Sequence, residues 1–355
     1  MTAMNATPPQ QLPAVSVIMP VLNEERHLRS SVQHILEQEY AGEMEVVIAL
    51  GPSTDRTDEI AAELVAENAA NERASVVTVP NPTGRTPAAL NAAIKASRHP
   101  VVVRVDGHGM LSPNYIATAV RLLEETGAQN VGGIMYAEGE NAWEDAVAAA
   151  MTSKIGVGNA AFHTGGAAGP ADTVYLGVFR REALEQQGGY NEEFIRAQDW
   201  ELNFRIREAG GQIWFSPELK VQYRPRPSVR ALAKQYKDYG RWRHVVARYH
   251  SGSINLRYLA PPTAVCAIAA GAVVGALVTP WGFAVPAGYL AAIAAGSVPA
   301  GKGLPLKARA QIPVALATMH MSWGWGFLTS PRSLAEKVIA SRRPAVPAPQ
   351  PAAAE

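Results

Sequence analysis

The sequence predicts an α/β fold with a mostly parallel central sheet, followed by helices that enter a membrane. Between residue 15 and about residue 209, short β-branched runs alternate with segments of helical periodicity, which is the pattern of βαβ units on a parallel sheet. Three consecutive valines, Val101 to Val103, indicate a strand that is covered on both faces. Further on, the 44 residues from Tyr258 to Gly301 contain no charged side chain, so the second half of the chain has a different character.

The predicted strands and helices of the first half alternate along the chain. We expect strands at 15–21, 44–50, 75–79 and 100–105, and helices at 27–38, 58–68 and 87–96. In such sheets, ligands bind beyond the carboxyl ends of the strands. The pattern predicts a domain at 15–227, preceded by a flexible tail at 1–14.

Composition and charge exclude several classes of protein. The chain has 355 residues, of which 48% are hydrophobic, and its formal net charge is +1. A chain of this length can bury a full core, and without a basic excess we expect no nucleic-acid partner. The single cysteine, Cys266, excludes an internal disulfide, and within its apolar stretch we expect a buried thiol.

A basic segment separates the two halves of the chain. Residues 224–248 hold eight Lys or Arg side chains against one acid, Asp238, with three aromatic residues among them. This composition is typical of an amphipathic helix at a membrane surface or beside an anionic ligand. We therefore predict a basic interfacial segment at 228–257.

Membrane helices are predicted for 258–330. The uncharged run, broken by Pro280, is long enough for two spans of about 20 residues each. The alternative is a buried Ala-rich helix pair in a soluble protein, although such helices normally show a polar face. A third apolar segment at 312–328 has basic residues on both sides, so it is left open whether it crosses, re-enters or lies in the interface. The basic, Pro- and Ala-rich tail at 331–355 is expected to be disordered.

The stretch "RVDGH", residues 104–108, ends the fourth predicted strand with a carboxylate and an imidazole. Asp106 and His108 lie two residues apart across Gly107, so both side chains can reach one point beyond the strand. An oxygen and a nitrogen ligand together suit a divalent ion, and Mn²⁺ accepts the nitrogen more readily than Mg²⁺. The alternative is a turn-capping Asp106 beside a solvent-facing His108.

The first two turns also carry polar residues where a strand gives way to a helix. "PVLNEERHL" begins at Pro20 and places Asn23 and Glu24 where exposed backbone amides favour an anionic or polar ligand. Helix capping by Asn23 would explain the same residues. Likewise, "GPSTDRTDE" at 51–59 is compatible with a simple turn capped by Thr54 or Asp55.

A third candidate is Asp199 in "AQDWELNFRI". Aspartate is a favoured N-cap, so one interpretation is structural. In the other, Asp199 is a general base, because a rigid helix start can hold a carboxylate within hydrogen-bond reach of a sugar hydroxyl.

The order of these motifs resembles the family 2 glycosyltransferases, which have the GT-A nucleotide-sugar-binding fold. The resemblance covers residues 15–257 and rests on "PVLNEE", "GPSTDRT", "NPTGRTPAALNAAI", "RVDGH" and "QDWELNFRI", in that order. More narrowly, "ADTVYLGVFRRE", "GGQIWF" and "QYKDYGRWR" are similar to segments of the succinoglycan-type glucosyltransferases of exopolysaccharide synthesis. A C-terminal set of membrane helices is also usual in that group.

The resemblance implies roles for individual residues. Asp106 takes the place of the aspartate that binds metal and diphosphate, His108 is a second metal ligand, and Asp199 matches the catalytic base, with Gln198 where relatives carry Glu. The metal would be Mn²⁺ or Mg²⁺. The positions near the nucleotide sugar are matched by Pro20, Glu24, Asn91 and Asp106.

Two further regions bear on the substrates. Gln235, Arg241 and Trp242 resemble, with different spacing, an element that holds an acceptor chain in processive relatives. Where the family carries an aspartate against uracil, this chain has Leu50 and Gly51. A UDP-sugar is the expected donor, and the base of the donor remains open.

The resemblance implies an inverting transferase that moves a sugar, expected to be a hexose, from a nucleotide-diphosphate donor to a lipid-linked or membrane-proximal acceptor. The product would belong to polysaccharide or glycolipid synthesis. The expected location is the plasma membrane, with the catalytic domain in the cytoplasm. Two alternatives remain: transfer to a polyprenyl phosphate, which needs no general base, and a non-catalytic membrane scaffold that keeps the GT-A shell.

Overall fold

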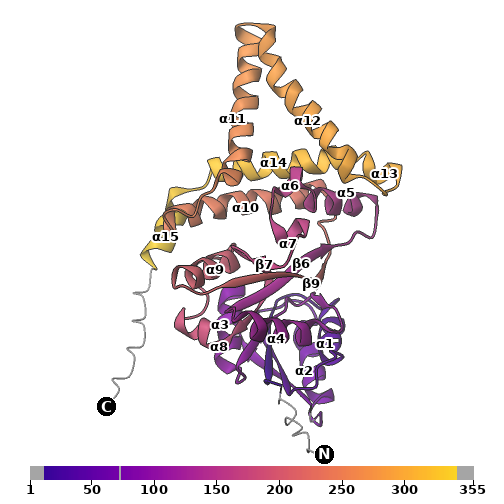
Figure 1. Ribbon diagram of the computed structural model, residues 1–355, viewed down its shortest axis with the longest axis vertical. Coiled ribbons are helices and arrows are strands. Elements are labelled where there is room, and N and C mark those ends of the chain that lie inside the picture. Colours follow the sequence, from indigo (N-terminus) through magenta and orange to yellow (C-terminus); the bar gives the residue numbers. More distant parts are fainter. Residues whose placement is uncertain (1–11, 72, 342–355) are drawn as a thin grey trace, which may run out of the picture.

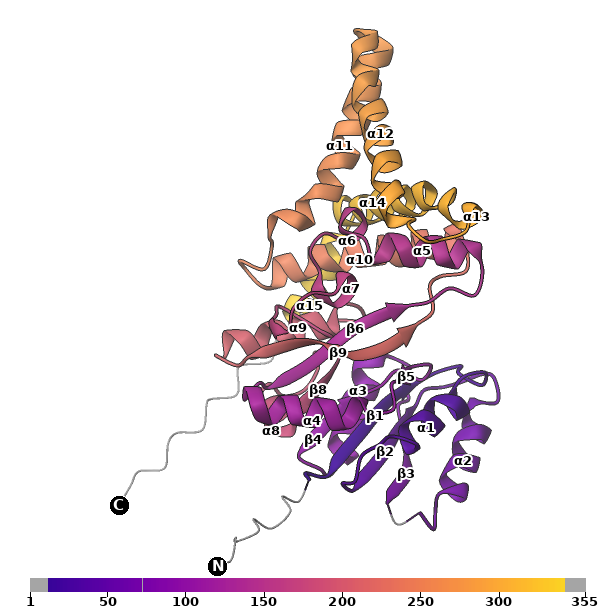
Figure 2. The same cartoon turned by 45° about the vertical axis from the view of Figure 1, so that its right-hand side comes forward.

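Three layers make up the protein in its computed structural model, which describes residues 12–71 and 73–341. A domain built on one sheet forms the first layer. Helices that lie flat above this domain form the second, and a long helical hairpin rises from them as the third (Figures 1 and 2).

Parallel strands with covering helices form one half of the sheet. The strand order is β3-β2-β1-β4-β8-β6-β9-β5, and the first four strands are parallel to one another. Their bounds are β1 (Val15–Val21), β2 (Met44–Leu50), β3 (Ala74–Pro80) and β4 (Val101–Arg104). The helices between them are α1 (Leu28–Leu36), α2 (Thr57–Glu67) and α3 (Thr86–Ala96). The predicted α/β fold is confirmed.

The other half of the sheet is mixed. β8 is antiparallel to both β4 and β6, whereas β6 and β9 are parallel. The strands are β5 (Met110–Leu111), β6 (Asn130–Ala137), β7 (Gly169–Pro170), β8 (Tyr175–Arg180) and β9 (Ile213–Tyr223). The helices of this half are α4 (Tyr115–Thr126), α8 (Arg181–Gln186) and α9 (Gln198–Glu208).

Both faces of the central strands are buried, as the valine run predicts. Val17 and Met19 of β1 join one apolar cluster, and Ile18 between them joins the cluster on the opposite face. Side chains of α1, α2 and α4 belong to the first cluster, and those of α3 and α9 to the second. Burial of each such side chain stabilises the folded state by about 1.5–3 kcal/mol. The buried strands in turn hold in place the loops at their carboxyl ends, where the site residues begin.

A flat layer of helices covers the mixed half of the sheet. It consists of α5 (Ala142–Met151), α6 (Lys154–Val157), α7 (Ala161–Thr164), α10 (Val229–Tyr249), α13 (Leu306–Arg309), α14 (Ile312–Leu328) and α15 (Arg332–Ala340). α10 and α14 lie side by side in very close contact (Figure 1). A Cβ at Gly240 of α10 would overlap the backbone oxygen of Trp323, and one at Gly326 of α14 that of Lys237. Glycine at these two positions therefore permits the close approach.

The hairpin consists of α11 (Leu256–Leu277), the short helix η1 (Pro280–Phe283) and α12 (Ala284–Ala300). Among the described residues, two segments are long and apolar enough to cross a membrane, Leu256–Leu277 and Pro280–Ala300, and each has 11% of its most apolar stretch buried. Trp281 at the tip is 84% exposed. A buried Ala-rich helix pair is therefore the wrong alternative, because both helices present their apolar side chains outward.

Three expectations for the second half need comment. The segment at 312–328, left open by its sequence, lies along α10 across the foot of the hairpin (Figure 2). The disordered tail predicted from 331 is wrong for its first part, because α15 packs Ala335 and Val338 against α10; residues 342–355 lie outside the described residues. Cys266, expected to be buried, is exposed, because α11 has only 11% of its most apolar stretch buried within the described chain.

Candidate active site

One long cavity of about 940 Å³ runs from the sheet to the helices above it. Its donor end, as we name it, is lined by Pro20, Glu24, Asp106, His108 and Asp199. Its membrane end is lined by Tyr258, Pro261, Ala264, Met319 and Trp323. The donor end thus lies beyond the carboxyl ends of β1 and β4, where ligands of such sheets bind, and the membrane end reaches α11 and α14.

Hydrogen bonds tie the first two turns of the domain together. Asn23 has a positive φ of 56°, and its Oδ1 accepts a hydrogen bond of 2.8 Å from the backbone N–H of Thr54. The backbone N–H of Glu24 donates to Oγ1 of Thr57 at 2.8 Å. Capping of the first helix by Asn23 is a wrong prediction, because α1 begins only at Leu28. Instead, Asn23 holds the turn that presents Glu24 to the cavity.

Glu24 and His108 form a carboxylate–histidine pair at the donor end. His108 Nδ1 lies 2.8 Å from Glu24 Oε1, and this hydrogen bond raises the pKa of His108. A Cβ at Gly107 would approach Glu24 Cγ to 2.9 Å, so glycine suits the close contact. Metal-binding histidines usually donate their second ring N–H to a carboxylate in this way. With Nδ1 occupied, Nε2 is the nitrogen that remains for a metal.

The residues present fit a divalent ion that a bound diphosphate helps to hold. Within 12–71 and 73–341, no group of three His, Cys, Asp or Glu side chains could hold a metal by itself. Asp106 and His108, both at the lining of the cavity, would supply one oxygen and one nitrogen ligand. A site with two protein ligands needs further oxygen ligands from its substrate, which is common for Mg²⁺ beside phosphates.

Arg104 bridges the two aspartates of the donor end. Its Nη2 lies 3.0 Å from Asp106 Oδ1, and its Nη1 pairs with Asp199 Oδ1. The arginine is 3% exposed. Burial opposes ionisation of Asp106, but the adjacent Arg104 charge prevails and holds the pKa of this carboxyl below its usual value. Arg104 therefore holds Asp106, the candidate metal ligand, close to Asp199, the candidate base.

Asp199 does not cap α9. The helix starts at Gln198, and its N-cap, Ala197, has a left-handed φ of 61° and no side-chain cap. Two residues after Asp199, the buried carboxylate of Glu201 accepts a hydrogen bond from Arg205 Nε, and its Oε1 lies 3.1 Å from His250 Nε2. The start of α9 is thereby fixed to the end of α10, and the Asp199 carboxylate is free of capping and lines the cavity.

The other predicted residues divide into two groups. Gln235 and Trp242 line the cavity on α10, and Gln235 Nε2 donates to the hydroxyls of Tyr223 and Tyr239 at 2.8 and 3.0 Å. Arg241 does not line the cavity. Asn91 also lies elsewhere, because its side chain bonds the backbone N–H and oxygen of Tyr190, each at 2.8 Å.

Several cavity residues were missed by the sequence analysis. Arg104 could have been found, since a charged residue two positions before Asp106 in a buried strand points to the same face. Arg243 belongs to the basic segment and, with Arg241, is a candidate from the sequence for holding an acceptor phosphate, with a snorkelling surface arginine as the alternative. Its position between two rings is not indicated by its sequence neighbourhood. Its guanidinium carbon lies 3.8 Å from the Trp200 ring centre and 3.7 Å from that of Tyr258.

A sheet of this topology, with Asp106 and His108 beyond its fourth strand and Asp199 at a helix start, is typical of a glycosyltransferase with a GT-A-like fold. Residues 16–188 match the family model Glycosyl transferase family 2. The chain is 32% identical over 316 residues to the succinoglycan biosynthesis protein ExoA of Rhizobium meliloti (strain 1021), covering 88% of this chain and 93% of that protein. The chain belongs to glycosyl transferase family 2, and its relatives act in polysaccharide or glycolipid synthesis.

Two further comparisons extend this result. A dolichyl N-acetyl-alpha-D-glucosaminyl phosphate 3-beta-D-2,3-diacetamido-2,3-dideoxy-beta-D-glucuronosyltransferase of Methanococcus voltae is 25% identical over 254 residues, or 70% of this chain and 77% of the relative. Among solved structures, the mannosyltransferase PcManGT of Pyrobaculum calidifontis, in complex with GDP-Man and Mn²⁺, aligns with a TM-score of 0.54. At 21% identity over 91% of each chain, that likeness concerns the fold.

Proposed function

We propose that this glycosyltransferase is an inverting enzyme that moves a hexose from a nucleotide-diphosphate donor to a lipid-linked acceptor at the membrane. A UDP-sugar is the proposed donor, and a polysaccharide or glycolipid the proposed product. One observation carries the proposal: a single cavity connects the acidic donor end to helices that are apolar enough for a bilayer. A soluble donor and a membrane-bound acceptor can therefore meet at Asp199.

In the proposed reaction, Asp199 accepts the proton of the acceptor hydroxyl. The freed oxygen forms a bond to the anomeric carbon of the sugar as the bond to the diphosphate breaks, and the nucleoside diphosphate leaves with the electron pair. Attack from the side opposite to the leaving group inverts the anomeric centre. Arg104 holds Asp199 by a charge-assisted hydrogen bond, so acceptor binding must weaken this pair before Asp199 can act as a base.

The diphosphate and a divalent ion are assigned to Asp106 and His108. When bound, Mn²⁺ or Mg²⁺ would supply charge stabilisation to the leaving diphosphate. The complex of PcManGT with GDP-Man and Mn²⁺ supports this choice. Pro20 and Glu24 would line the nucleotide sugar, whereas Asn91 would act indirectly by fixing the loop at 189–192.

Membrane attachment is assigned to the hairpin of α11 and α12. Basic side chains stand at its foot, among them Lys302, Lys307 and Arg309, and the tip at 278–283 has none. The excess of Lys and Arg on the cytoplasmic side of membrane proteins supports a plasma-membrane location with the catalytic domain in the cytoplasm. The Methanococcus relative is named for a sugar linked to dolichyl phosphate. This name supports a lipid-linked acceptor.

The test is sugar transfer by Asp199→Asn in membranes with radiolabelled donor. Loss of a general base reduces a rate by about 10²–10⁴-fold, so we expect at least a hundredfold loss of transfer with nucleotide binding intact. Asp58→Asn, which removes an exposed carboxylate on α2, is the matched control. Normal transfer by Asp199→Asn would remove Asp199 from the mechanism and favour a polyprenyl phosphate as acceptor. If the native protein hydrolysed no donor with Mn²⁺ present, a scaffold would be favoured.

A further inference from the structure

Two arginines at the membrane end of the cavity have no acidic partner. Arg243 and Arg257 both line the cavity, and neither takes part in any ion pair among the residues that the structure describes. Arg243 is 6% exposed, and burial lowers its pKa to about 10. Buried cations are normally paired, so this end of the cavity has positive charge to offer to an anion.

Aromatic rings hold these arginines in place. Arg243 lies between the rings of Trp200 and Tyr258, and its Nη2 donates to the backbone oxygen of Ser253 at 2.6 Å. Arg257 lies 4.7 Å from the Tyr258 ring centre, and its Nη2 donates to the Tyr258 hydroxyl at 2.6 Å. Nε of both arginines is buried without a hydrogen-bond partner. Each guanidinium therefore keeps donor capacity for a ligand.

The short helices α6 and α7 contain no carboxylate, and Asp172, whose charge acts on Arg243, pairs instead with Arg207 at 3.6 Å. His163 of α7 lines the cavity, and burial, with a contribution from the charge of Arg257, lowers its pKa to about 4. It is neutral at physiological pH. Its Nδ1 is likewise buried and without a partner, so it adds a polar atom and no negative charge.

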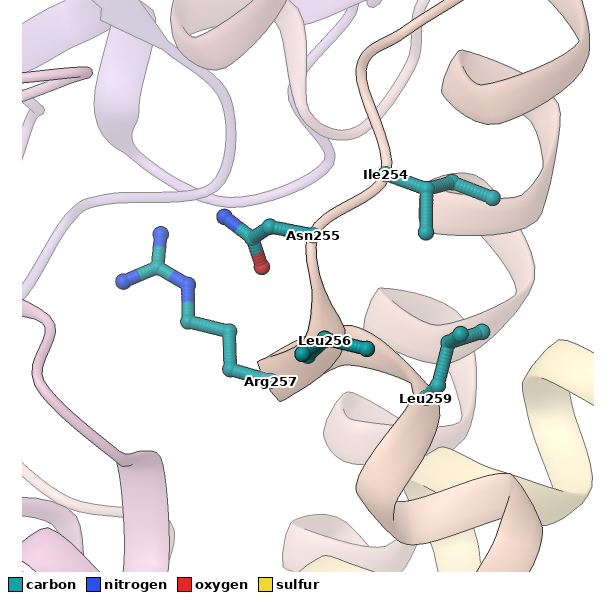
Figure 3. A pocket seen from close by; sticks show the side chains of 5 residues that line it. All are labelled: Ile254, Asn255, Leu256, Arg257 and Leu259. Carbon is teal, nitrogen blue, oxygen red and sulfur yellow. The ribbon is translucent and has the colours of Figure 1, made fainter.

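Arg257 also marks the place where the cavity reaches the membrane surface. It lines a second hollow at the foot of α11, together with Ile254, Asn255, Leu256 and Leu259. Figure 3 shows Arg257 and Asn255 extending to one side of the chain, and Ile254 and Leu259 to the other. Leu256 is 86% exposed. A cation beside exposed apolar side chains, at the start of a candidate membrane span, fits an amphipathic ligand that enters from the bilayer.

We propose that Arg243 and Arg257 bind the phosphate group of the lipid-linked acceptor. The hydrocarbon chain of the lipid would lie against Pro261 and Ala264 of α11 and against Trp323 of α14. Trp200, which stacks on Arg243, directly follows Asp199 in the chain, so a sugar linked to the bound phosphate would lie next to the base. This inference rests on the proposed function and adds the anion-binding residues of the acceptor.

The experiment measures binding of a long-chain prenyl phosphate, in neutral detergent micelles, through the fluorescence of the cavity tryptophans. Arg257→Gln should weaken binding about tenfold or more, since it removes a charge-assisted hydrogen bond. Arg257→Lys, which keeps the charge, should retain most of the affinity. The control is Arg309→Gln, which removes an exposed cation of the same layer outside the cavity and should change binding less than twofold.

Three results would overturn the inference. In the first, Arg257→Gln binds the prenyl phosphate with an affinity within twofold of that of the native protein. In the second, Arg309→Gln loses as much affinity as Arg257→Gln. In the third, inorganic diphosphate binds as tightly as the prenyl phosphate. The last result would show that the lipid adds nothing and that the site takes free phosphate. Calorimetry with nucleoside diphosphates on the same samples separates the two proposals, because a native protein that binds no nucleotide contradicts the proposed function, whatever Arg257 does.

Discussion

The two ends of the cavity differ in whether their charged side chains have partners of opposite charge. At the donor end, Arg104 pairs with both Asp106 and Asp199, and Glu24 pairs with His108. At the membrane end, Arg243 rests on aromatic rings and has no acidic partner. Each of these acids at the donor end thus has a partner before any ligand arrives, and a ligand must exchange existing ion pairs. The membrane end has an unmatched charge, so a bound anion would stabilise it directly.

Arg104→Met should remove the shared partner of Asp106 and Asp199 at the donor end and have the largest effect on stability. Removing one partner of a buried ion pair leaves the other charge unpaired and costs about 3–5 kcal/mol. We expect the lower end of this range, because the Asp106 and Asp199 side chains keep 26% and 33% of their exposure. Denaturant unfolding of the detergent-solubilised protein measures the loss. The double variant with Asp199→Asn should recover part of it, and no recovery would contradict the bridge.

Glu24→Gln should weaken metal binding at the donor end about 10–100-fold, the usual effect of losing a carboxylate behind a metal-binding histidine. The native protein should bind Mn²⁺ more tightly as pH rises through the pKa of His108. That pKa lies above the ordinary value because of Glu24, and the protonated ring cannot bind the ion. In Glu24→Gln, the pH range over which the affinity for Mn²⁺ rises should move to lower pH. Calorimetric titration with Mn²⁺ across pH checks both effects, and identical profiles would exclude His108 as a ligand.

Arg243→Met tests the opposite end and should change stability less than Arg104→Met does. It removes the stacking of one guanidinium, worth about 0.5–2 kcal/mol for each cation–π contact. However, burial disfavours the charge of Arg243, and no acid is left unpaired, so part of the loss is offset. The same unfolding experiment compares the two variants. A greater loss for Arg243→Met than for Arg104→Met would contradict the difference between the two ends.

Labelling of Cys266 gives the smallest and most local test. This single cysteine is exposed on α11 of the hairpin. In detergent-free membranes, a water-soluble maleimide should label Cys266 far more slowly than it does after detergent solubilisation, because the bilayer covers the helix. Equal rates would contradict insertion of the hairpin. Ala340→Cys, on the exposed face of α15, combined with Cys266→Ala, provides the accessible control.

Much of the fold could be predicted because alternating patterns report burial directly. The predicted strand at 44–50 matches β2, and the neighbouring carboxyl ends bring Glu24, Asp106 and His108 together. The course of α14 could not be predicted, since it depends on the glycine contacts with α10, which join residues far apart in the chain. Asn91 matched a motif, yet its environment depends on the loop at 189–192, which only the folded chain places.

The place of Arg257 in the cavity escaped prediction for a related reason. Arg257 stands one residue before the uncharged run and would be taken from the sequence as a flank of a membrane helix. Only the packing of α11 against the domain places it near Arg243 and His163, at the lining of the same cavity as Asp106. A chemical role for such a residue therefore follows from tertiary structure.

The central claim is that one cavity joins a metal-assisted nucleotide site to the membrane. Its most direct test measures, by calorimetry, the binding of a panel of nucleoside diphosphates in the presence of Mn²⁺ and in the presence of EDTA. The account predicts that one nucleoside diphosphate binds at least tenfold more tightly with Mn²⁺, and that Asp106→Ala abolishes this difference. Equal affinity with and without the metal, or an unchanged difference in Asp106→Ala, would contradict it.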